Sequence, residues 1–182
     1  MRSKSQDRID RPALMAHLRG EFALDWQGIH GAPHWARVRL NGLEICAQNS
    51  ANPHVIELFS FFHDSKRENE HEDHGHGTRG AQNALALHGR FFEATQEEMA
   101  LLAEACQGHS DGLRLADRTV QTCWDSDRLD LGRVGYTVDP LRLCTPQAQQ
   151  PETIARAGAR AMAWLRIVRA QDEREAMAWL RP

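Results

Sequence analysis

The chain has 182 residues, a formal net charge of −3 and 41% hydrophobic residues. This length suits one domain with a core, and the composition favours neither a disordered chain nor a membrane protein. The slight negative charge argues against a general nucleic-acid binder, because such a protein needs a basic face to neutralise phosphates. We therefore expect a small-molecule partner, no nucleic acid and no membrane.

The N-terminal residues and the cysteines favour a cytoplasmic protein. The first ten residues, MRSKSQDRID, are polar and lack the apolar segment of a secretory signal. The cysteines lie far apart and form no C-x-x-C pair, which suits reduced thiols and disfavours a finger-type zinc site. They are Cys46, Cys106, Cys123 and Cys144.

Prolines mark the first predicted helices. Pro12 opens a helix through ALMAHLRGEFALDW (13–26), and Pro33 opens a second whose apolar positions lie mainly on one side. Pro53 opens the third, PHVIELFSFFHD, which is apolar on most faces. A helix of that kind is typically buried, so we expect it at the centre of the fold.

Capping residues mark the later helices, which follow a polar, glycine-rich loop over 64–77. Thr95 and Glu98 form the pattern of a capping box, and Asp117 can cap a helix through TVQTCWDSDRLDL. Pro151 leads the last helical region.

Only the short GRVGYTV (132–138) shows an alternating, strand-like pattern. The prediction is therefore an all-α fold, a single-domain helical bundle on which C-terminal helices (151–182) pack. Those C-terminal helices either complete the core or form a homodimer contact, and the sequence leaves both open.

Five successive predicted helices each carry a histidine or an acid near an end or on an inner face. His63 and Asp64 close the buried helix, where an unpaired carboxylate costs several kcal/mol unless it is protonated, hydrogen-bonded or bound to a cation. The helices before and after it carry the remaining candidates, which are His34, His76, His109 and Asp127.

Metals that polarise water favour such mixed imidazole and carboxylate ligands. Six groups exceed the needs of one tetrahedral ion. With a bridging carboxylate they suit two cations about 3.5 to 4 Å apart.

The His63-Asp64 doublet at a helix end, preceded by His34 and followed by Asp127 in DSDRLD, resembles the HD-domain superfamily of metal-dependent phosphohydrolases. The resemblance covers about residues 25–135 and implies an HD-type helical domain. It also implies that these four residues hold the first metal.

Two further motifs resemble the branches of that superfamily that hold a pair of metals. They are His76 in HGTRGA and His109 in GHSDG. By this resemblance the two histidines complete a second metal site, with Asp64 as the bridge. The ions implied are one or two divalent transition metals, with Mn, Fe, Ni, Co and Zn all acceptable to such ligands.

Several alternatives stay open at these positions. Asp125 is the fallback for Asp127, and His74 can replace His76, although His71 and His74 suit solvated loop residues better. His30, four residues before His34, can orient a ligand, line the pocket or serve the scaffold.

The resemblance implies a phosphohydrolase that acts on a phosphate ester or nucleotide through a metal-activated water. Asp64 is then catalytic as a ligand, and Lys66 and Arg67 stand where a substrate phosphate arrives. Glu68 is near enough to orient water or the leaving group.

Arg37 and Arg128 are further candidates for binding the substrate anion, although Arg37 can instead pair with an acid on a neighbouring helix. Two other functions remain open: a di-iron HD-type oxygenase, and a non-catalytic metal-binding regulatory module. The identity of the substrate stays open as well.

Overall fold

The computed structural model describes residues 8–179, with side chains for residues 8–171. The expectation for the N-terminal residues 1–7, and the last three residues of the predicted C-terminal helices, lie outside this range. Within it the chain is helical and has no strand. Its elements are α1 (Arg11–Glu21), α2 (Ala32–Asn49), α3 (Pro53–Phe62), α4 (His76–Leu87), α5 (Gln96–Gly108), α6 (Arg118–Arg128), the 3-10 helices η1 (Leu131–Val134) and η2 (Pro140–Arg142), and α7 (Pro151–Trp179). The all-α prediction is confirmed.

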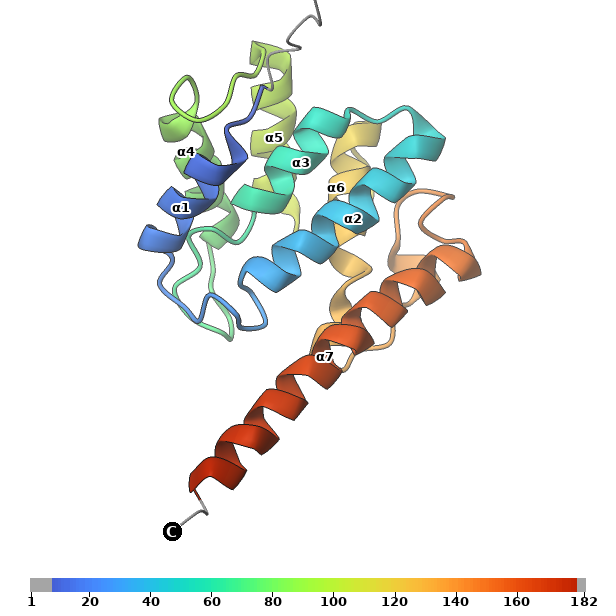
Figure 1. Ribbon diagram of the computed structural model, residues 1–182. Coiled ribbons are helices and arrows are strands. Elements are labelled where there is room, and N and C mark those ends of the chain that lie inside the picture. The colour runs from blue at the N-terminus through green and yellow to red at the C-terminus, as the bar shows by residue number, and fades with distance from the viewer. Residues whose placement is uncertain (1–7, 180–182) are drawn as a thin grey trace, which may run out of the picture.

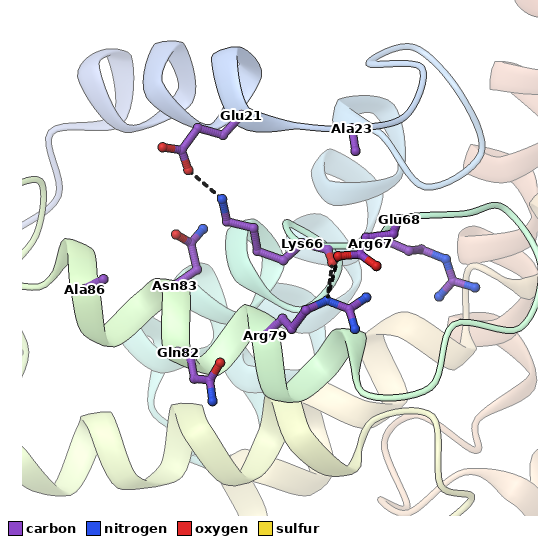
Figure 2. A pocket seen from close by; sticks show the side chains of 9 residues that line it. All are labelled: Glu21, Ala23, Lys66, Arg67, Glu68, Arg79, Gln82, Asn83 and Ala86. Atoms are coloured by element: carbon purple, nitrogen blue, oxygen red, sulfur yellow. Dashed lines mark hydrogen bonds and ion pairs between the residues drawn. The ribbon is translucent and has the colours of Figure 1, made fainter.

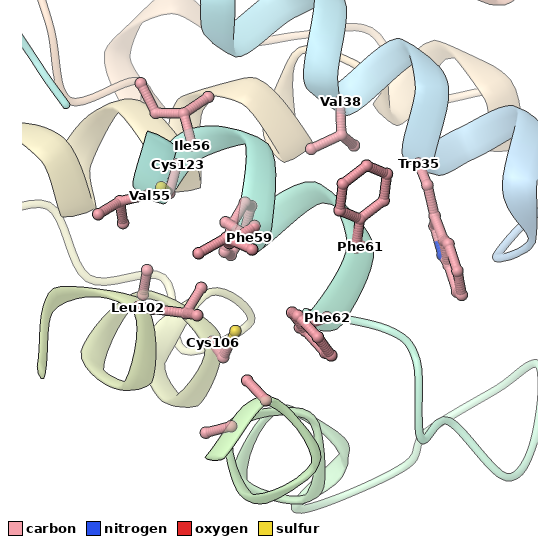
Figure 3. Packing of buried hydrophobic residues seen from close by; sticks show 14 of the residues in the cluster. Trp35, Val38, Val55, Ile56, Phe59, Phe61, Phe62, Leu102, Cys106 and Cys123 are labelled. Atoms are coloured by element: carbon pink, nitrogen blue, oxygen red, sulfur yellow. The ribbon is translucent and has the colours of Figure 1, made fainter. Parts of the chain in front are cut away.

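Helix α3 lies at the centre of the bundle, as its apolar sequence predicts. It packs against α2, α4, α5 and α6 (Figure 1). Its side chains are buried from Val55 to Phe62, and Phe59 and Phe62 meet the apolar faces of the neighbouring helices (Figure 3). Among the buried residues of α3, Glu57 is the charged one, and its carboxylate accepts hydrogen bonds from Arg11 and Arg39. This packing fixes the end of α3, where the His63-Asp64 doublet follows.

The predicted caps begin the helices where expected. Helix α3 begins at Pro53 as predicted, and Asn52, which the sequence analysis did not single out, accepts hydrogen bonds from its first backbone N–H groups. Thr95 and Glu98 form the capping box of α5, and the Asp117 carboxylate accepts from Thr119 at the start of α6. These local signals were correct because a cap satisfies backbone donors within a few residues of itself.

Two segments differ from the prediction. The first helix ends at Glu21, because the backbone turns extended at Phe22, whose ring packs 5.4 Å from that of Trp35. Residues 132–138 form no strand. Their first residues belong to η1, and Gly135 then adopts a left-handed φ of 86°. No neighbouring strand is present among the described residues to pair with the alternating pattern.

Helix α7 is one long helix. Its first half packs against η1 and α2, where Ala157 joins a small buried cluster with Ile45 and Leu129. Figure 1 shows its second half projecting from the body of the protein. The helix thus completes part of the core, while a homodimer contact stays a prediction.

All four cysteines are free thiols. No helix in the described part of the chain is both long and apolar enough to cross a bilayer.

Candidate metal centre

Three predicted ligands from separate helices converge beside the end of α3. His34 lies in the first turn of α2, His63 directly follows α3 and Asp127 lies in the last turn of α6. The Nε2 atoms of His34 and His63 are 3.0 Å apart, and Asp127 Oδ1 is 3.3 Å from His34 Nε2. These three atoms form a group that can hold a metal ion.

The other three predicted ligands form a second group. His76 begins α4 and His109 follows α5, and their Nε2 atoms are 2.9 Å apart. Asp64 Oδ1 is 3.3 Å from His76 Nε2 and 3.7 Å from His109 Nε2. This group too can hold a metal ion.

Asp64 joins the two groups. Its Oδ1 faces His76 and His109, whereas its Oδ2 lies 3.7 Å from the Nε2 atoms of both His34 and His63. The residue is 2% exposed. Oδ1 is the one buried polar side-chain atom without a hydrogen-bond partner among the side chains that the structure describes. A buried carboxylate oxygen without a donor is costly, and a cation satisfies it.

The four imidazoles are oriented by their other ring nitrogens. In each, Nδ1–H donates to a protein oxygen, at distances between 2.6 and 3.1 Å: the Asp130 carboxylate for His34, and the carbonyls of Phe59, Asp73 and Cys106 for His63, His76 and His109. Each Nε2 therefore presents a lone pair, and these lone pairs face one another in two close pairs. Facing lone pairs repel unless a proton or a cation lies between them, so the donor set fits metal ions.

The charges of the site favour cations over protons. Burial lowers the pKa of His63 to about 3 and also lowers the pKa of His76. Burial opposes ionisation of Asp64 and Asp127, but the surrounding imidazoles hold the pKa of both carboxyls well below the usual range. For His109, burial is outweighed by the nearby carboxylates, which raise its pKa. Most of the donor set is thus deprotonated near neutral pH, as metal ligands must be.

Asp130, which the sequence analysis missed, fixes the orientation of His34. Its carboxylate accepts the Nδ1–H of His34 at 2.7 Å and two hydrogen bonds from Arg37, at 2.7 and 3.0 Å. A carboxylate behind a histidine ligand is a frequent second layer of metal sites. One signal was present: Asp130 follows Asp127 by three residues, just as Arg37 follows His34.

Two glycines let α4 approach its neighbours closely enough to bring the second group together. A Cβ atom on Gly77 would lie 2.1 Å from the Cys106 carbonyl oxygen of α5. On Gly80 it would lie 2.3 Å from the Phe62 carbonyl oxygen of α3. Both contacts are too short for any side chain, so the HGTRGA segment must carry glycine at these two positions.

The structure separates the alternatives that the sequence left open. The carboxylate of Asp125 is turned away from the histidines and accepts hydrogen bonds from Cys144 and Thr145. His71 and His74 are exposed, so His76 is the histidine that joins the group. His30 is buried beside His34, and its Nδ1 is hydrogen-bonded to Glu70.

A pocket of about 510 Å³ lies between the end of α1, residues 66–68 and α4, and its lining includes none of the six candidate ligands. Three cations and two acids line it, together with Gln82, Asn83 and two alanines (Figure 2). Lys66 reaches Glu21 across the pocket at 2.6 Å, and Glu68 lies 3.6 Å from Arg79. Arg67 links the pocket to the ligands, because its Nη1 is 3.2 Å from His76 Nε2. Lys66, Arg67 and Glu68 thus all line this pocket, and their contacts with a substrate stay predictions.

The two other predicted anion-binding arginines are not brought into the site. The guanidinium of Arg37 is held by Asp130 and lies over the ring of Trp164. Arg128 donates to the carbonyls of Leu113 and Arg142. Both side chains are buried, so their observed contacts are structural.

Comparisons with family models, with curated proteins and with solved structures found no match to this chain.

Proposed function

We propose that this protein is a metal-dependent phosphohydrolase of the HD-domain type, acting on a small phosphate ester. The observation that carries the proposal is Asp64, a buried carboxylate whose two oxygens face two separate groups of imidazole ligands. Paired cations joined by a carboxylate suit the clamping of a phosphoryl group.

The ligand spacing suits divalent transition metals. The two His–His separations are 3.0 and 2.9 Å, and the carboxylate oxygens lie 3.3 to 3.7 Å from the imidazole nitrogens. Mn, Fe, Co, Ni and Zn all accept imidazole and carboxylate ligands, so we propose one or two ions of this class. Bound at the six ligands, such ions polarise water and neutralise charge on a phosphoryl group.

The pocket that Arg67 links to the ligands is where we place the organic part of the substrate. None of its nine lining residues is aromatic, and the two apolar residues among them, Ala23 and Ala86, are small. Such walls offer hydrogen bonds and charges rather than a stacking surface for a base. This favours a hydrophilic phosphate ester, such as a polyol or sugar phosphate, over a nucleotide. Lys66 and Arg79 are placed to bind its oxygens.

Elemental analysis followed by a substrate screen tests this function. The metal found in the purified protein is restored after chelation, and sugar phosphates, polyol phosphates and nucleotides are assayed with and without oxygen. We expect hydrolysis that persists without oxygen and is fastest for hydrophilic monoesters. Activity that requires oxygen would refute the hydrolase and support an oxygenase.

Paired substitutions locate the centre. Asp64→Ala should abolish both metal retention and turnover, because it removes the carboxylate whose two oxygens face the two groups. His71→Ala, in the exposed loop, should leave both unchanged. Equal effects of the two substitutions would show that the centre lies elsewhere.

A further inference from the structure

We propose that Arg67 guards the second metal position, so that its guanidinium and a cation compete for His76 and Asp64. This inference rests on the proposed metal centre and goes beyond it, because it makes the two positions unequal. The cation held by His34, His63 and Asp127 then binds first, and Arg67 sets how readily the second follows.

The contacts of Arg67 place it on the ligand atoms themselves. Its Nη1 lies 3.2 Å from His76 Nε2 and 3.6 Å from Asp64 Oδ1. Since arginine can only donate, this contact uses the His76 lone pair that a metal needs. The Nδ1–H of His76 already donates to the Asp73 carbonyl, so Nε2 is the nitrogen available for either partner. A cation at this position must therefore displace the guanidinium.

Arg67 is held in place by its own loop. Its Nε donates to the Asn69 carbonyl at 3.1 Å and its Nη2 to the His71 carbonyl at 2.5 Å. Both acceptors belong to the polar segment between α3 and α4, and only 12% of the Arg67 side chain is exposed. The hydrogen bonds from Nε and Nη2 thus hold the guanidinium where its Nη1 contacts His76 of the second group. Displacing it costs these hydrogen bonds as well as its attraction to Asp64.

The first group carries no comparable competitor. Among the described residues, Asp127 forms no ion pair with a lysine or an arginine, and its ionic partner is His34. Arg37 does not contact the ligand atoms of this group. It donates to Asp130, which accepts the Nδ1–H of His34 on the side of the ring opposite Nε2. The asymmetry between the two groups therefore comes from Arg67.

Lys66 offers a matched control. It is the neighbouring residue with the same charge, but its ammonium pairs with Glu21 across the pocket instead of meeting a metal ligand. A neutral substitution of either residue removes one positive charge from the loop that follows Asp64. Only removal of Arg67 frees the His76 lone pair.

The test is a titration of the metal-stripped full chain with Mn²⁺, followed by calorimetry and by elemental analysis of bound metal. For the wild type we expect two Mn²⁺ ions in two steps. In Arg67→Gln the Kd of the second Mn²⁺ ion should fall about tenfold or more, because the ion no longer displaces a charge-assisted hydrogen bond. Lys66→Gln should change the Kd of the second Mn²⁺ ion by no more than about twofold. Arg67→Ala, checked for an unchanged thermal unfolding curve, serves as a second variant.

An unchanged or weakened second step in both Arg67 variants, with two ions still bound by the wild type, would overturn the inference and leave the metal centre intact. A wild-type chain that binds no Mn²⁺, Fe²⁺, Co²⁺, Ni²⁺ or Zn²⁺ would refute the proposed function, and this inference with it.

Discussion

Replacing Gly80 by alanine should destabilise the protein, although alanine is the better helix former. The new Cβ atom would lie 2.3 Å from the Phe62 carbonyl oxygen and 3.1 Å from that of His63. Both are backbone atoms at the end of the central helix, so α4 itself must move by about 1 Å. Overpacking of this severity costs about 3 kcal/mol, and the helix propensity of alanine returns about 1 kcal/mol. The expected net loss is about 2 kcal/mol of unfolding free energy.

Gly158 in α7 provides the matched control, because a Cβ atom there has no neighbour within 4 Å. Its replacement by alanine should raise the unfolding free energy by about 0.5 to 1 kcal/mol. Urea denaturation of the two metal-stripped variants, followed by tryptophan fluorescence, measures both effects. A Gly80→Ala variant as stable as Gly158→Ala would refute the inference that α4 lies too close to the end of α3 to carry a side chain at position 80.

Three other predictions follow from the contacts of the site and of the core. Asp130→Asn should lower the unfolding free energy by about 3 kcal/mol, measured by urea unfolding, since it leaves Arg37 buried without its anion. The same substitution should weaken Mn²⁺ binding about 10-fold to 100-fold in a titration, because the carboxylate that orients His34 is lost. Glu98→Gln should lower the unfolding free energy by about 1 to 3 kcal/mol at pH 7, because the hydrogen bond from Arg8 lowers the pKa of Glu98 to about 2. This folded-state pKa is below the usual 4.5, so the difference from the wild type should be complete above pH 4.5 and vanish as the pH falls toward 2; a difference that persists at pH 2 would contradict the assignment. Chelation should lower the midpoint of thermal unfolding, and Mn²⁺ at 100 times its Kd should restore about 2.7 kcal/mol in the wild type but nothing in Asp64→Ala.

The sequence predicted what depends on neighbours along the chain. Pro53 and the Thr95–Glu98 box start helices because they act within one turn, and the His63-Asp64 doublet follows an apolar segment that had to be buried. Candidate ligands near the ends of successive helices could therefore be named before their distances were known, and the family resemblance divided them between two metals.

The sequence could not predict contacts that depend on how helices cross. Asp130 lies 96 residues from His34, and no spacing shows which acid of DSDRLD faces which partner. Arg37 was therefore left with two interpretations, a contact with a substrate anion or a pair with an acid of a neighbouring helix, and the structure shows the second, with Asp130. The strand-like alternation of residues 132–138 was misleading for the same reason, since a strand needs a partner that local sequence does not supply.

The ring N–H bonds of His63 and His109 give these residues a second task. Each donates to a carbonyl in the last turn of the helix that it follows, at Phe59 and Cys106, and so finishes that helix. A related chain that binds no metal would still gain from keeping both histidines. Their persistence in related chains would therefore be poor proof of enzymatic activity, and Asp64, whose Oδ1 has no hydrogen-bond partner among the described side chains, would be the residue to inspect.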